Sequence, residues 1–179
     1  MPSLISEEYR AQQRQLHEEH DNYGTASVKF APVVSQIVNA AKITTLLDYG
    51  AGKGRLARSL EGIKGDLDIQ MYDPAIPAFA AAPEPAELVC CIDVLEHIEP
   101  FAIDEVIAHL ASLTQRFAFI TIHCGPAQKV LPDGRNAHLI QEPPKWWLTK
   151  ILPYFDPCEF RLVPGGCMLV LKPIKGLIV

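Results

Sequence analysis

The stretch Asp48-Tyr49-Gly50-Ala51-Gly52-Lys53-Gly54 joins an apolar run to a helical pattern. The preceding run, residues 44–49 (TTLLDY), predicts a short buried parallel strand. Residues 55–60 place leucines at helical spacing and predict a helix. A glycine-rich turn between a strand and a helix lets a ligand approach the backbone closely and directs helix N–H groups toward it. The sequence therefore predicts an α/β fold that binds a nucleotide-like cofactor.

Two carboxylates indicate which cofactor. Asp48 lies two positions before Gly50, where it would repel a pyrophosphate but attract a cation. Asp73 follows a second predicted strand, residues 67–72, roughly 20 residues after the glycines, which suits hydrogen bonds to a ribose diol. A ligand with ribose, adenine and positive charge but no phosphate is S-adenosylmethionine.

The chain resembles the class I S-adenosylmethionine-dependent methyltransferases in three segments. They are LLDYGAGKGRLA (46–57), MYDPA (71–75) and ELVCCIDVLEHIEP (87–100). The resemblance covers roughly residues 44–172, and the region around residues 134–147 also looks like small unassigned methyltransferases of phages and bacteria. It implies a Rossmann-like three-layer αβα sandwich with a mostly parallel sheet. It also implies an enzyme that uses S-adenosyl-L-methionine.

The expected organisation is one domain over residues 1–179, with N-terminal helices in 1–42 and the Rossmann-like core in 43–172. Six to seven strands are expected, ending in an antiparallel hairpin around Pro164-Gly165-Gly166. Only 20 residues separate Asp73 from Asp93, and residues 76–85 are rich in proline and alanine. The third-strand region is therefore expected to be compressed, which leaves less wall around the adenine.

The resemblance implies a set of cofactor-binding residues at the carboxyl ends of the strands. Asp48 is expected to face the methionine ammonium, directly or through water, and Asp73 the ribose hydroxyls. The glycines are expected to allow close approach of the backbone. The full set is Asp48, Gly50, Ala51, Gly52, Gly54, Asp73, Pro74, Asp93 and Val94.

The candidate catalytic residues are His123, Glu96 and His97. His123 ends a predicted strand, residues 117–122, where an imidazole could remove a proton from a substrate hydroxyl or amine. In many class I members the Glu-His pair is instead structural. Small-RNA 2′-O-methyltransferases hold a divalent metal with a similar set, which here would be Asp93, Glu96, His97 and His138. This chain has Asp in the first position and no basic RNA surface, so the favoured expectation is no metal.

The loop and helix after residue 124 supply the candidate substrate-binding residues, which are Arg135, Asn136, His138 and Trp147. Arg135 and Asn136 could hold a polar substrate or form an ordinary solvated turn. Trp146 and Trp147 point about 100° apart on a helix, so one is expected in the core. Tyr23-Gly24 forms either a lid or a simple turn.

The N-terminal residues 6–20 predict a polar, exposed helix whose docking the sequence does not define. His17, His20 and His109 are expected on polar helix faces without a role. The N-terminus has no signal-peptide apolar region and no run reaches the ~18 apolar residues of a membrane span, which predicts a cytoplasmic protein. The cysteines lack metal-site spacing and are expected to be buried free thiols.

The composition of the chain limits the kinds of molecule that it is expected to bind. A chain of 179 residues, 49% hydrophobic, is large enough for a substantial core. A net charge of −5 excludes a broad nucleic-acid-binding surface. The expected function is transfer of a methyl group by in-line displacement to a hydroxyl or amine of a small-molecule or nucleotide-like acceptor. The alternatives are a metal-assisted ribose 2′-O-methyltransferase and a non-catalytic S-adenosylmethionine-binding or accessory protein. The oligomeric state stays open.

Overall fold

The computed structural model describes residues 4–20, 24–62, 67–174 and 176. The helices are α1 (Glu7–Glu19), α2 (Ala26–Ala41), α3 (Arg55–Leu60), α4 (Ile103–Leu113) and α5 (Pro144–Ile151), with 3-10 turns η1 (Pro77–Phe79) and η2 (Leu95–His97). The strands are β1 (Thr45–Tyr49), β2 (Asp68–Tyr72), β3 (Ala86–Ile92), β4 (Thr114–His123), β5 (Phe155–Val163) and β6 (Gly166–Pro173).

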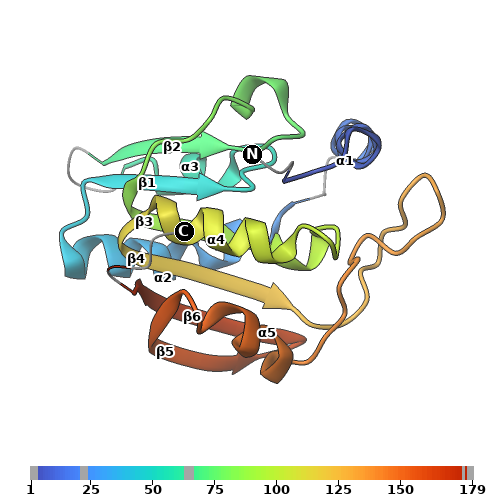
Figure 1. Cartoon of the computed structure of the whole chain (residues 1–179). Helices are drawn as coiled ribbons and strands as arrows, with labels where there is room; N and C mark the ends of the chain where they lie inside the picture. Colours follow the sequence, from blue (N-terminus) through green and yellow to red (C-terminus); the bar gives the residue numbers. More distant parts are fainter. Residues whose placement is uncertain (1–3, 21–23, 63–66, 175, 177–179) are drawn as a thin grey trace.

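The described strands form one six-stranded sheet in the order β2-β1-β3-β4-β6-β5. The first four pair in parallel, and β6 pairs antiparallel with both β4 and β5. The mostly parallel sheet and the C-terminal antiparallel hairpin are both confirmed. All four parallel strands end at the same edge, and α1 lies beside that edge (Figure 1).

Helices cover both faces of the sheet, which gives the three layers expected of an αβα sandwich (Figure 1). One face buries a cluster that includes Val34, Val38, Leu56 and Leu60 of α2 and α3. The other buries a larger cluster with α4 and α5, including Val106, Ile107, Leu110, Trp147 and Ile151. In α4, apolar positions at helical spacing face the core. Asp104 and Glu105 in its first turn stabilise the helix by interacting favourably with the helix dipole.

The compressed third-strand region is also confirmed. Between β2 and β3 the chain forms only the short turn η1, none of whose residues is buried. β2 is therefore an edge strand, and Glu84 N–H donates to Gln70 Oε1 (2.9 Å) where the segment returns past it.

Several elements differ from expectation. α2 (Ala26–Ala41) lies within the predicted helical region 1–42 but carries Pro32 in its interior. The prediction that the first helix is exposed is wrong: Tyr9 and Leu16 of α1 pack with Leu131 and Ala137 of a distant loop.

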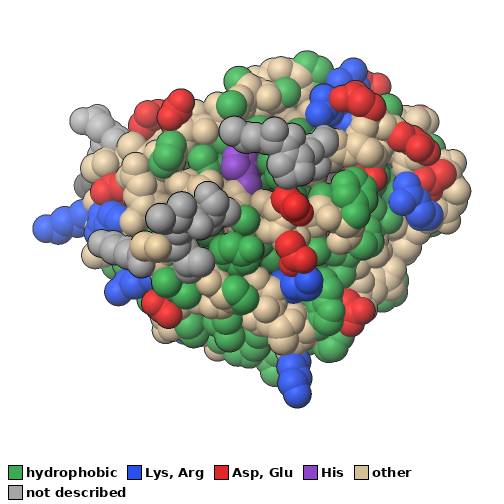
Figure 2. All heavy atoms as spheres, viewed as in Figure 1, with side chains coloured by type: hydrophobic (Ala, Val, Ile, Leu, Met, Phe, Trp, Pro, Cys, Tyr) green, Lys and Arg blue, Asp and Glu red, His purple; other side chains and the backbone are tan. Residues whose placement is uncertain are grey.

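The remaining expectations concern thiols and membranes. Among the described residues all five cysteines are free; Cys90, Cys91 and Cys167 are buried, whereas Cys158 is exposed on β5. Across the described ranges we find no helix with the length and apolar character needed to cross a bilayer. The surface seen in Figure 2 intersperses acidic and basic side chains.

Candidate active site

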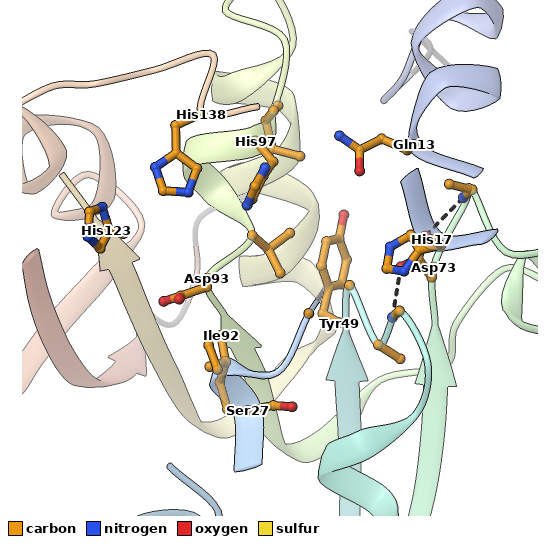
Figure 3. A pocket seen from close by; sticks show the side chains of 18 of the residues that line it. Gln13, His17, Ser27, Tyr49, Asp73, Ile92, Asp93, His97, His123 and His138 are labelled. Carbon is orange, nitrogen blue, oxygen red and sulfur yellow. Dashed lines mark hydrogen bonds between the residues drawn. The ribbon is translucent and has the colours of Figure 1, made fainter. Parts of the chain in front are cut away.

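A cavity of about 500 Å³ opens at the carboxyl ends of the parallel strands. Its lining comes from the turn after β1, the ends of β2, β3 and β4, the start of α2, the helix α1 and the loop after β4 (Figure 3). Open α/β sheets bind ligands at this edge, and the volume lies within the usual range for small-molecule sites.

Asp48 lines this cavity with a buried carboxyl group. Its side chain is only 3% exposed, and Oδ2 has no hydrogen-bond partner among the described residues. Burial, and secondarily the negative charge of Asp73, raises the pKa of Asp48 to about 7. A buried carboxyl without a partner is costly, and a bound cation would remove that cost.

Asp73 ties the glycine turn to the end of β2. Its Oδ2 accepts from Gly52 N–H and its Oδ1 from Ala75 N–H, both at 2.9 Å. Each oxygen keeps a second lone pair, so the carboxylate can still accept hydrogen bonds from a diol.

Glycine is required at two positions of the turn. Gly50 has φ +78, and a Cβ there would lie 2.4 Å from Val94 Cγ2. A Cβ at Gly52 would lie 2.9 Å from His17 Cε1. The turn is therefore held close to both the β3–η2 loop and α1. Gly54 begins α3 and does not line the cavity, whereas Ala51 and Pro74 do.

Three imidazoles gather on the opposite side of the cavity from Asp73 (Figure 3). The ring centroids of His97 and His138 are 4.7 Å apart, and those of His138 and His123 are 5.1 Å apart. The His97 Nδ1 contacts Ala137 O (2.8 Å) and the His138 Nδ1 contacts Gly125 O (2.6 Å), which assigns the proton to Nδ1 in both rings. Each Nε2 is therefore a lone-pair acceptor.

Burial favours the neutral form of His97 and His138. It lowers the pKa of His97 to about 3, with a further contribution from the charge of His138. Burial likewise lowers the pKa of His138. Two neutral imidazoles present hydrogen-bond acceptors to whatever ligand occupies this side.

Glu96 is fully buried and does not line the cavity. Its Oε1 accepts from the backbone N–H of His123 (2.7 Å), while Oε2 has no partner among the described residues. Burial, and then the charge of Asp93, raises the pKa of Glu96 well above its usual range. The carboxyl group therefore joins η2 to the end of β4.

Three of the four residues in the metal hypothesis lie together. Ligand atoms of Glu96, His97 and His138 all lie within 4.8 Å of one another. Asp93 lines the cavity but is outside this group, and its Oδ1 accepts from Thr121 Oγ1 (3.0 Å). Asp93 also holds a left-handed backbone conformation (φ 52), of a kind that clusters at functional sites.

Of the four expected substrate contacts, the structure brings only His138 to the cavity. Arg135 pairs with Asp133 on an exposed turn, and Asn136 exchanges hydrogen bonds with the backbone of Ala127. Trp147 is fully buried in the core, where its ring N–H donates to Glu142 O. In this arrangement the side chains of all three residues contact other parts of the protein.

Other residues at the cavity were not expected from the sequence. Tyr9, Gln13 and His17 of α1 line it, although His17 was expected to have no role. The buried positions 9, 12, 13 and 16 of α1 share one helical face, but two of them are glutamines, so the sequence alone does not mark this face as buried. His109 is also engaged, with Nδ1 3.0 Å from the Tyr49 hydroxyl. Gly24 lines the cavity, while Tyr23 lies outside the described residues.

Comparisons by sequence with protein-family models and with curated proteins find no match. Solved structures do match. An O-methyltransferase family protein from Burkholderia thailandensis superimposes with a TM-score of 0.63 at 16% identity, over 93% of this chain and 64% of its own length. This chain thus spans less than two-thirds of that protein.

Two further structures contain the cofactor or its product. Burkholderia thailandensis 1,6-didemethyltoxoflavin-N1-methyltransferase, with 1,6-didemethyltoxoflavin and S-adenosylhomocysteine bound, has a TM-score of 0.68 at 17% identity, covering 98% of this chain and 93% of its own. Human N-acetylserotonin methyltransferase in complex with SAM has a TM-score of 0.58 at 16% identity. The match covers 94% of this chain and 57% of the human protein. The chain has the Rossmann-like fold of class I S-adenosylmethionine-dependent methyltransferases, as predicted.

Proposed function

We propose that this protein transfers a methyl group from S-adenosylmethionine to a small-molecule acceptor. The observation that carries the proposal is the buried, unpartnered carboxylate of Asp48 beside a glycine turn. The fold supports it, since the 1,6-didemethyltoxoflavin enzyme described above shares the fold over nearly its whole length.

The residues of the cavity fit the cofactor. The ammonium of its methionine part would supply Asp48 with the cation that this carboxylate lacks. Asp73 would accept hydrogen bonds from the ribose hydroxyls, and Gly50 and Gly52 line the cavity without a side chain of their own. When bound, the cofactor supplies a sulfonium methyl with an already activated leaving group, so the protein mainly aligns and desolvates the reactants.

The histidine side of the cavity is the proposed acceptor subsite, and its chemistry favours a hydroxyl or amine. His138 has an Nε2 lone pair directed away from its Nδ1 hydrogen bond, so it can accept a proton from such a group. His97, with a pKa of about 3, is too weak a base near neutral pH and would only accept a hydrogen bond. His123 and Asp93 complete the lining.

The first test is calorimetric titration of the protein with S-adenosylmethionine and S-adenosylhomocysteine, followed by a screen of small hydroxyl and amine compounds with radiolabelled cofactor. Micromolar binding that Asp48→Asn abolishes, with transfer of label, supports the proposal. Binding without transfer to any acceptor would favour the non-catalytic alternative. No binding of either ligand would overturn the proposal.

A second candidate is metal-assisted methylation of a ribose hydroxyl, favoured by the grouping of Glu96, His97 and His138. A tetrahedral ion about 2.1 Å from each ligand atom needs those atoms about 3.4 Å apart. In this structure the ligand atoms of the three residues are separated by up to 4.8 Å. The side chains would have to move inward, so this candidate ranks second. Calorimetry with Mn²⁺, comparing wild type with His138→Ala, tests it: no Mn²⁺ binding by the wild type would exclude it.

A further inference from the structure

Asp73, Pro74 and Ala75 line the cavity at the end of β2, the edge strand, where no further strand of the described chain encloses it. Only η1 lies between β2 and β3, and it buries no residue. The adenine of a cofactor whose ribose lies at Asp73 must nevertheless be shielded from water if it is to bind tightly. Another part of the chain must supply this wall.

The segment from Leu4 to His17, here called the N-terminal wall, runs along the cavity, and its C-terminal half lies beside Asp73, where a Cβ at Gly52 would be 2.9 Å from His17 Cε1. Leu4, Ile5, Tyr9, Gln13 and His17 all line the cavity. Figure 3 shows Gln13 and His17 on the same side as Asp73, with His123 and His138 across from them.

The N-terminal wall is fastened to the rest of the molecule at several points. Ser6 donates from both its backbone N–H and its hydroxyl to the Glu99 carboxylate, each at 2.8 Å. Gln12 donates to Asp133 Oδ2 (2.9 Å), and the Tyr9 hydroxyl donates to His97 O. The side chain of Arg14 reaches Ala75 O (3.5 Å), just past Asp73. The anchors lie in three different loops, so they hold the segment in a defined place.

The lining on this side has the character that a planar heteroaromatic base requires. Leu4 and Ile98 pack against the cluster that contains Tyr72 and Val106, and all four residues line the cavity. Ile5, the neighbour of Leu4, is 9% exposed and packs in a separate cluster with Tyr9, Leu131 and Ala137, which holds the start of the N-terminal wall against the loop after β4. Apolar side chains with a few polar groups among them are typical of such sites.

We propose that the N-terminal wall forms the adenine subsite, with Leu4 and Ile5 packing against the base. The inference rests on the proposed function, because it names the part of the chain that holds one half of the cofactor. Residues 4–17 would thus shield the adenine from water in place of the missing third strand.

The test is calorimetry on the full chain with two ligands. One is S-adenosylhomocysteine; the other is 5′-methylthioadenosine, which keeps the adenosine but lacks the amino-acid group. The double variant Leu4→Ala/Ile5→Ala should lose about tenfold in affinity for both ligands, because apolar contact with the base is removed. Asp48→Asn should weaken only S-adenosylhomocysteine. Leu162→Ala, at a side chain 71% exposed on β5, is the matched control and should change neither.

Circular dichroism establishes that each variant folds. If the double variant does not, Leu4→Ala alone serves, because Leu4 is only partly buried, with an expected loss of about threefold. Unchanged affinity for 5′-methylthioadenosine in a folded variant would overturn the inference while leaving the proposed function intact. A wild-type protein that binds neither ligand would overturn the proposed function, and the inference with it.

Discussion

At Asp48 the protein keeps a carboxylate whose burial works against folding. Because the pKa is raised from 3.8 to about 7, the folded protein holds this proton more tightly than the unfolded chain does. The contribution to stability is therefore fully present below pH 3.8 and is lost as the pH rises toward 7. A residue that costs stability at neutral pH is understandable if it serves a ligand.

Replacing Asp48 with Asn should reveal this cost. We expect the variant to be more stable than the wild type at pH 8, by up to about 4 kcal/mol, and the advantage to shrink as the pH falls to 5. Urea unfolding at both pH values measures the difference, and Glu105→Gln on the exposed face of α4 is the control. An Asn variant no more stable than the wild type at pH 8 would mean that the carboxylate finds a partner in solution.

Gly50 offers a second test at this scale, because two effects can be separated. Gly50→Ala meets both a positive φ and the methyl groups of Val94, whereas Gly62→Ala meets a positive φ with no atom of the described residues within 4 Å. We expect Gly62→Ala to cost about 1 kcal/mol of unfolding free energy and Gly50→Ala about 3 kcal/mol or more. Equal losses in denaturant titrations would show that Val94 moves aside freely.

At the scale of elements, η2 is held to the end of β4 by a single buried carboxyl group. Burial raises the pKa of Glu96 and so favours its uncharged form, with Oε1 accepting from His123 N–H. Glu96→Gln preserves that acceptor and should change the unfolding free energy by less than about 1 kcal/mol. Glu96→Ala leaves a buried N–H unpaired and should cost about 2–4 kcal/mol. Thermal unfolding of the two variants checks this, and a large loss in the Gln variant would indicate a charged Glu96.

Much of this element layout is predictable because local patterns determine it. Residues 45–49 form a strand and residues 55–60 a helix within the predicted bounds, since a short apolar run and leucines at helical spacing leave little choice. The glycine turn likewise predicts the position of Asp48 and Asp73 at the cavity.

What the sequence does not reveal are contacts between distant segments. The docking of α1 depends on Ser6 meeting Glu99 and Gln12 meeting Asp133, partners 93 and 121 residues away. No local pattern encodes these pairs, so His17 was not recognised as a cavity residue. The substrate roles expected for Arg135 and Asn136 depend on the loop conformation, which their own hydrogen bonds direct away from the cavity.

At the scale of the whole molecule, α1 and α4 differ in how much apolar surface each buries. α4 buries five apolar residues in the larger core, whereas α1 buries only Tyr9 and Leu16 together with two glutamines. Local opening follows the amount of buried apolar contact. The N-terminal wall should therefore separate from the molecule more readily than α4.

Hydrogen exchange followed by mass spectrometry can measure this difference. We expect backbone amides of α1 to exchange well before those of α4, and S-adenosylhomocysteine to slow the exchange of α1 more than that of α4. The β5–β6 hairpin, remote from the proposed adenine subsite, is the internal control. Equal protection of the two helices without ligand would contradict the expectation.

The exposed segment between β2 and β3 can accept an insertion. Residues 81–82 are exposed and belong to no helix or strand, and they follow the cavity residues Pro74 and Ala75 by several positions. Extra sequence introduced there would project into solvent without displacing either core. A fluorescent reporter or a small binding module could thus be grafted between Ala81 and Ala82, close enough to Asp73 to sense occupancy of the cavity.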